Sequence, residues 1–147
     1  MTSNTGKYTS NGRLEDPKNV LTSIVGEYNF NTDNAVFTNN VDLVNSRDNY
    51  VIHTNKLLYN TRTNIAKLVE EAEITSDENK IITSNGDYNT ATEKANLYVK
   101  NGVQPKLFAK DDRTLEGDSI HYDRHTGEGT AIGNVTVNDP KHHAILT

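Results

Sequence analysis

The feature that most constrains the fold is an internal repeat marked by tyrosine. Tyrosines at positions 28, 59, 88 and 122 are separated by 31, 29 and 34 residues. Alanine follows the first three of them by seven residues, at Ala35, Ala66 and Ala95, and Gly129 takes that place in the fourth unit. We therefore predict a partial first unit and four similar units, over residues 1–25, 26–54, 55–84, 85–116 and 117–147.

Within each unit the sequence predicts strands joined by turns. A polar stretch rich in Asn, Asp, Thr and Gly separates the tyrosine from the alanine, and such residues favour turns because they tolerate positive φ or bond their own backbone. Apolar and polar residues alternate beside these turns, as in Val135-Thr136-Val137-Asn138. Strand-only units of about 30 residues indicate an all-β chain: a slender stack of antiparallel strands sharing one core.

One stretch has a second interpretation. Residues 64–74 place Ile65, Leu68, Val69 and Ala72 at helical spacing among good helix formers. The equivalent positions of the first and fourth units have strand patterns, so we predict strands here too.

Composition limits the partners. Hydrophobic residues make up only 33% of the chain and the mean hydropathy is −0.73, as expected where each strand buries one face only. The net charge of −5 and the lack of a basic run argue against nucleic acid as a partner. The sequence contains no apolar run long enough for a transmembrane segment, and no export signal, which we expect upstream of residue 1. Because the chain has no cysteine, disulfides and thiolate metal sites are excluded.

The fourth unit resembles a known repeat. Residues 115–123, Gly129 and residues 131–139 are similar to the OstA-type repeat of LptA-like lipopolysaccharide-transport proteins, and residues 26–43 and 86–97 are weaker copies. The resemblance implies a twisted, open β-jelly roll whose apolar interior receives acyl chains. It also implies a periplasmic location and end-to-end joining, through edge strands, with copies of itself or with other transport-bridge proteins. We expect one domain over residues 1–147, part of a longer protein.

The resemblance makes the inward-facing side chains the candidate lipid-binding trough. Taken singly, each of these residues is more often a core residue than a lipid contact, and only the repeat as a set favours lipid. The trough candidates are Tyr28, Ala35, Phe37, Val41, Leu43, Tyr59, Ala66, Leu68, Tyr88, Ala95, Leu97, Ile120, Tyr122, Val135 and Val137. The alternative is a structural or adhesive β-solenoid stalk with a filled core, and a carbohydrate-active β-helix enzyme ranks third.

Catalytic and metal sites are poorly represented. The five histidines are scattered, and adjacent histidines such as His142-His143 on a strand point to opposite faces. Glu70-Glu71 has no partner signal and is predicted to face solvent, and residues 127–129 are too short for a phosphate loop. We therefore expect no metal, no cofactor and no enzymatic activity.

Overall fold

The computed structural model describes residues 7–15, 19–46, 49–77, 79–110, 112–139 and 144–146. Within these ranges the chain forms fifteen strands and no helix, which confirms the all-β prediction. The strands are β1 (Lys7–Glu15), β2 (Asn19–Asn29), β3 (Asn34–Asn45), β4 (Tyr50–Asn60), β5 (Ile65–Leu68), β6 (Ala72–Ser76), β7 (Asn79–Thr83), β8 (Gly86–Asn89), β9 (Lys94–Tyr98), β10 (Lys106–Ala109), β11 (Thr114–Glu116), β12 (Ser119–Asp123), β13 (Glu128–Ile132), β14 (Thr136–Asp139) and β15 (Ala144–Leu146).

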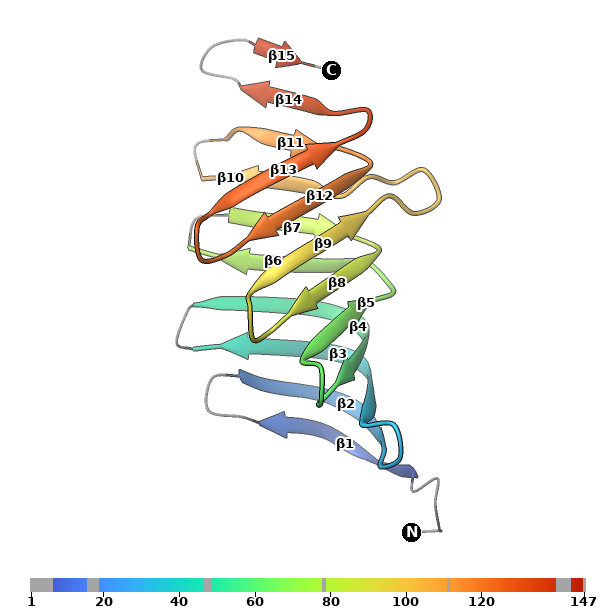
Figure 1. Cartoon of the computed structure of the whole chain (residues 1–147). Coiled ribbons are helices and arrows are strands. Elements are labelled where there is room, and N and C mark those ends of the chain that lie inside the picture. Colours follow the sequence, from blue (N-terminus) through green and yellow to red (C-terminus); the bar gives the residue numbers. More distant parts are fainter. Residues whose placement is uncertain are drawn as a thin grey trace.

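The strands stack along one axis in two sheets that share their first members (Figure 1). Strands β1 to β4 pair antiparallel in sequence order. The first half of β4 then pairs with β6, and its second half pairs with β5. From there one sheet continues as β6-β7-β10-β11-β14-β15 and the other as β5-β8-β9-β12-β13. We call them the first and the second sheet.

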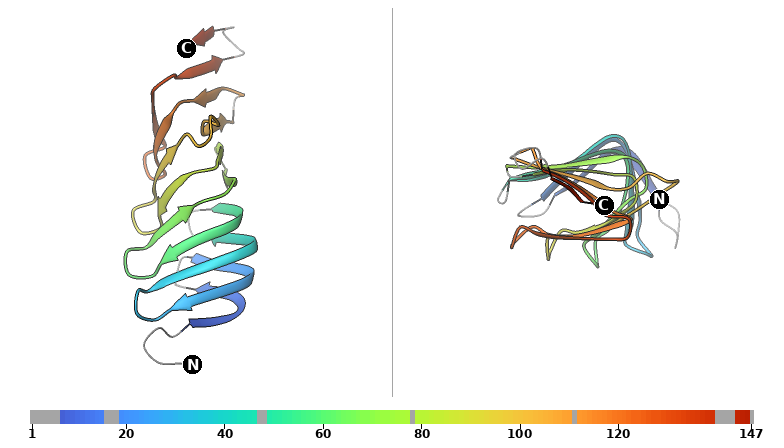
Figure 2. Two further views of the ribbon diagram at one scale, coloured as in Figure 1. Left: turned by 90° about the vertical axis from the view of Figure 1, so that its right-hand side faces the viewer. Right: turned by 90° about the horizontal axis from the view of Figure 1, so that it is seen from above.

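Seen along the axis, the two sheets form a V that is joined along one side (Figure 2). We call the joined side the bend and the opposite side, where the hairpin turns lie, the mouth. In β3 the bend falls at Asn39 and Asn40, whose φ angles are 66° and 48°. An uninterrupted strand would turn Asn39 inward with Phe37 and Val41, whereas both asparagines are exposed. Asparagine suits these positions because it tolerates the left-handed conformation.

The tyrosine repeat corresponds to a repeated turn at the mouth. One residue after each repeat tyrosine, a side-chain oxygen accepts hydrogen bonds from the backbone N–H groups two and three residues later. Four residues after that capping residue, the backbone has positive φ. The capping residues are Asn29, Asn60, Asn89 and Asp123, and the positive-φ residues are Asp33, Asn64, Glu93 and Gly127. The turns also bond to one another: the backbone N–H groups of Thr61, Thr90 and Arg124 donate to carbonyls of the preceding turn.

The stretch with helical spacing forms two strands, as the repeat register predicts. In β5 and β6, Ala66, Leu68, Ala72 and Ile74 are buried and alternate with more exposed residues. Val69 lies in the connection between the strands, at the bend. The apparent helical period therefore arises because a three-residue bend interrupts a period of two.

Candidate functional site

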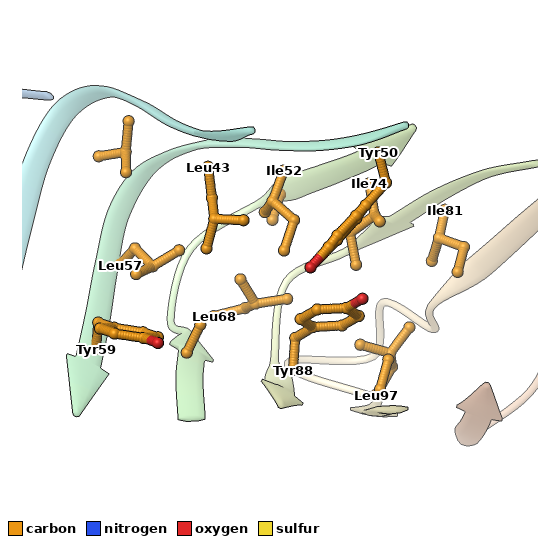
Figure 3. Packing of buried hydrophobic residues seen from close by; sticks show 14 of the residues in the cluster. Leu43, Tyr50, Ile52, Leu57, Tyr59, Leu68, Ile74, Ile81, Tyr88 and Leu97 are labelled. Carbon is orange, nitrogen blue, oxygen red and sulfur yellow. The ribbon is translucent and has the colours of Figure 1, made fainter. Parts of the chain in front are cut away.

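The candidate site is the space between the two sheets. Apolar side chains from both sheets point toward one another there (Figure 3). All but three of the predicted trough residues are buried in this single cluster, with exposures of 7% or less. The exceptions are Tyr28, which packs against the cluster, and Val135 and Val137, which are partly buried.

The sequence prediction missed most of the first sheet's contribution. Ile52, Ile74 and Ile81 face the second sheet and are no more than 8% exposed, and Tyr50 lies at the mouth with 2% exposure. Ile74 and Ile81 lie in strands of five residues, whose alternation covers few positions, whereas Tyr50 and Ile52 lie in the longer β4. The stretch from Ile81 to Thr83 fits the closing stretch of the repeat, and that recurrence could have identified Ile81.

The interior is closely packed. The cavity beneath the mouth has a volume of about 10 Å³, roughly the room that one water molecule needs. Its lining includes Tyr50, Ile81, Tyr88, Ala95 and Tyr122. An acyl chain can therefore enter this part of the interior only if the two sheets move apart.

Packing is looser toward the C-terminal end. Leu107 and Ala131 belong to the edge of the cluster and are only partly buried. Gly129 takes the alanine position of the repeat there, and a Cβ at this residue would lie 3.4 Å from the Tyr122 ring and 3.9 Å from Leu107. The replacement of alanine by glycine thus removes one inward methyl group.

Polar side chains line the mouth. At the N-terminal end, Asn45 Nδ2 donates to Asn19 Oδ1 over 3.0 Å, and the Tyr50 hydroxyl lies 3.4 Å from both side chains. Farther along, Asn79 Nδ2 donates to the Tyr122 hydroxyl over 2.7 Å. These side chains provide hydrogen-bond partners for one another where the interior meets water.

The rings of Tyr50 and Tyr88 meet across the space between the sheets, with centroids 5.2 Å apart. Burial, together with the neighbouring Tyr50, raises the pKa of the Tyr88 hydroxyl far above its usual range. Burial therefore disfavours the charged form of Tyr88.

Charged groups do not form a catalytic constellation in the described part of the chain. His53 Nδ1 pairs with Asp42 over 2.6 Å on an exposed surface, and His125 Nε2 pairs with Glu93 over 2.9 Å at the mouth. Among the described residues, no group of three or more His, Asp or Glu side chains is placed to hold a metal ion. His142 and His143 lie outside the described residues.

Glu70 and Glu71 are exposed, as predicted. In the part of the chain that the structure describes, no helix has the length and apolar character needed to cross a membrane.

The chain matches the family described as "OstA-like protein" over residues 1–49 and 46–109. The fourth unit, which carries the most distinctive part of the resemblance, lies beyond this match. No curated protein sequence matches the chain.

A solved structure similar to this fold is LptH from Pseudomonas aeruginosa, described as the LptA-homologous periplasmic component of the conserved lipopolysaccharide transport device. The TM-score is 0.63 at 15% sequence identity, over 90% of this chain and 87% of LptH. At this identity the similarity concerns the fold, and it confirms the predicted β-jelly-roll architecture. The match to the family covers residues 1–109 of 147, and the chain therefore belongs to the OstA-like proteins.

Proposed function

We propose that this protein is a non-enzymatic lipid-binding module that helps carry lipopolysaccharide, or a related lipid, across the periplasm. The observation that carries the proposal is one continuous apolar cluster held between two sheets that are joined on one side only. The family membership and the LptH-like fold support the same function.

The apolar cluster suits a lipid whose tails must be hidden from water. Burying one methylene is worth about 0.8 kcal/mol, so a chain of about 12 methylenes gains on the order of 10 kcal/mol before the costs of binding. In this protein the interior side chains already contact one another. The net affinity therefore depends on how well an acyl chain replaces those contacts when the sheets separate.

The ends of the stack suit end-to-end assembly. Among the described strands, β1 pairs only with β2, and β13 and β15 each have one neighbour. The free backbone groups of such edge strands can accept a strand from another protein or from a second copy. We propose that these edges extend the apolar interior from one module to the next.

A filled-core stalk is the second candidate function, and the close packing beneath the mouth favours it. In that case the same residues stabilise the fold and never contact lipid. The two functions differ in one measurable property, which is whether a lipid tail reaches the inward side chains.

Photo-cross-linking tests this difference. Leu97 and Tyr98 are adjacent in β9, yet Leu97 is fully buried in the interior and Tyr98 is 39% exposed on the outside. With p-benzoylphenylalanine at each position in turn, we expect purified lipopolysaccharide to cross-link at position 97 and not at position 98. Phe37 and Thr38 form a second inward and outward pair. Cross-linking at the outward positions alone, or at none in variants that keep the wild-type circular dichroism spectrum, would contradict the proposal.

A further inference from the structure

Two side-chain contacts join the sheets across the mouth. Asn79 is in β7 of the first sheet, and its amide donates to the hydroxyl of Tyr122 in β12 of the second sheet over 2.7 Å. Tyr50, at the start of β4 in the first sheet, stacks obliquely on Tyr88 in β8 of the second sheet. All four residues line or border the small cavity beneath the mouth.

The bend and the mouth are held by different kinds of interaction. At the bend the chain itself connects the sheets, because β2, β3 and β4 run through it and each later unit crosses it (Figure 2). The two contacts at the mouth depend on side chains that are far apart in the sequence, 43 residues in the case of Asn79 and Tyr122. Separation of the sheets at the mouth therefore breaks these contacts but leaves the backbone ladders of each sheet intact.

We propose that Tyr50, Tyr88, Asn79 and Tyr122 form a latch that controls sideways access of an acyl chain to the interior. This inference rests on the proposed lipid-binding function. The aromatic rings complete the apolar interior when the latch is closed, and the Asn79 amide bonds the Tyr122 hydroxyl at the boundary with water. Opening exposes these polar groups to water, which can replace the lost hydrogen bond, so the latch opens at moderate cost.

A buried reporter behind the latch measures opening without any lipid. Ala95 is 1% exposed and lines the cavity, and the chain has no natural cysteine. In an Ala95→Cys variant, the rate of reaction with a thiol reagent such as 5,5′-dithiobis(2-nitrobenzoate) reports how often the interior is accessible.

The test compares two substitutions that each remove one hydroxyl group. Tyr122→Phe removes the acceptor of the bond across the mouth. Tyr59→Phe removes a hydroxyl that bonds Thr90 over 2.9 Å within the second sheet and does not cross the mouth. We expect Tyr122→Phe to raise the labelling rate of Cys at position 95 about 2- to 10-fold, the range for the loss of one hydrogen bond, and Tyr59→Phe to leave it within about 2-fold.

Urea unfolding of both variants shows whether labelling follows global stability instead. Equal rates for the two variants, or rates that follow their free energies of unfolding, would overturn the latch.

A covalent block tests the role of the latch in lipid access. Asn79→Cys and Tyr122→Cys, combined in one chain and joined by a short bismaleimide, close the mouth permanently. With p-benzoylphenylalanine at position 97, we expect the joined protein to cross-link lipopolysaccharide at least 10-fold less than the same protein before joining. Equal cross-linking before and after joining would show that lipid reaches the interior by another route, and the latch would be wrong.

The two proposals fail separately. If the thiol labelling behaves as expected but no variant cross-links lipopolysaccharide, the mouth opens and the lipid-binding function is refuted. If lipopolysaccharide cross-links at position 97 but Tyr122→Phe does not change the labelling rate, the function stands and the latch is refuted.

Discussion

Replacing Gly86 by alanine is expected to destabilise the protein strongly, because the backbone conformation and the close approach of a neighbouring strand both oppose an added methyl group. Gly86 begins β8 with φ at 145°, and it lies opposite Leu97 of β9. A Cβ at this position would lie 2.4 Å from the carbonyl oxygen of Asn96 and 2.9 Å from Cα of Leu97. Both atoms belong to the backbone, so no side-chain rotation relieves the contact.

The magnitude follows from two costs. Forcing an extra carbon into a closely packed site typically costs about 1–3 kcal/mol, and holding a non-glycine residue in a sparsely populated backbone conformation costs about 1–3 kcal/mol. We therefore expect Gly86→Ala to lower the free energy of unfolding by about 2–6 kcal/mol. That loss is a large part of the total stability of a typical domain, which is about 5–15 kcal/mol.

Urea unfolding followed by far-ultraviolet circular dichroism measures this loss, and Gly127→Ala is the matched control. Gly127 also has positive φ, at 74°, but a Cβ there meets no atom within 4 Å. Only the backbone cost of about 1–2 kcal/mol applies to the control. If the two variants lose the same free energy, the close approach of β8 and β9 does not exist and the reasoning is refuted.

Three further predictions concern the core, the repeated turns and the surface network. Leu68→Ala, in the fully buried core, should cost about 2–5 kcal/mol in urea unfolding, and Leu58→Ala, which faces outward, less than about 1 kcal/mol; equal losses would contradict the assigned faces. Asn89→Ala removes the acceptor of two backbone N–H groups of its turn and should cost about 1 kcal/mol by the same assay, with no loss counting against the capping role. Hydrogen bonds from the side-chain amides of Gln104 and Asn134 lower the pKa of Asp118. The stabilisation that these bonds give is therefore present above the ordinary carboxyl pKa of about 3.9, and it is lost as the pH falls through the lowered pKa. Gln104→Ala should raise the pKa of Asp118 in an NMR titration, and an unchanged pKa would be the contrary result.

The inward faces could be predicted where the strands are long. In β3 the alternation of Ala35, Phe37, Val41 and Leu43 runs over nine residues, and the structure buries all four. The polar pair at Asn39 interrupts the pattern because it forms the bend, and alternation alone does not distinguish a bend from a turn. The turns at the mouth could be predicted from the recurrence of tyrosine, since each repeat tyrosine precedes a capping Asn or Asp.

The closing of the interior could not be predicted. Contacts across the mouth, such as Asn79 with Tyr122, join residues on different sheets whose relative position depends on the V-shaped cross-section. No local pattern specifies how far apart the sheets lie. The sequence therefore indicated an apolar inner face, and only the structure showed that the side chains beneath the mouth fill it.

Nuclear Overhauser contacts between lipid tails and protein methyl groups test the lipid-binding interior most directly. With methyl-labelled protein and lipopolysaccharide, acyl methylenes should contact the inward methyls of Leu97 and Ile120, which are both fully buried in the free protein. Ile132 serves as the outward reference because it is 56% exposed in β13. Contacts to the inward methyls are the predicted result, and contacts to Ile132 alone would contradict the account.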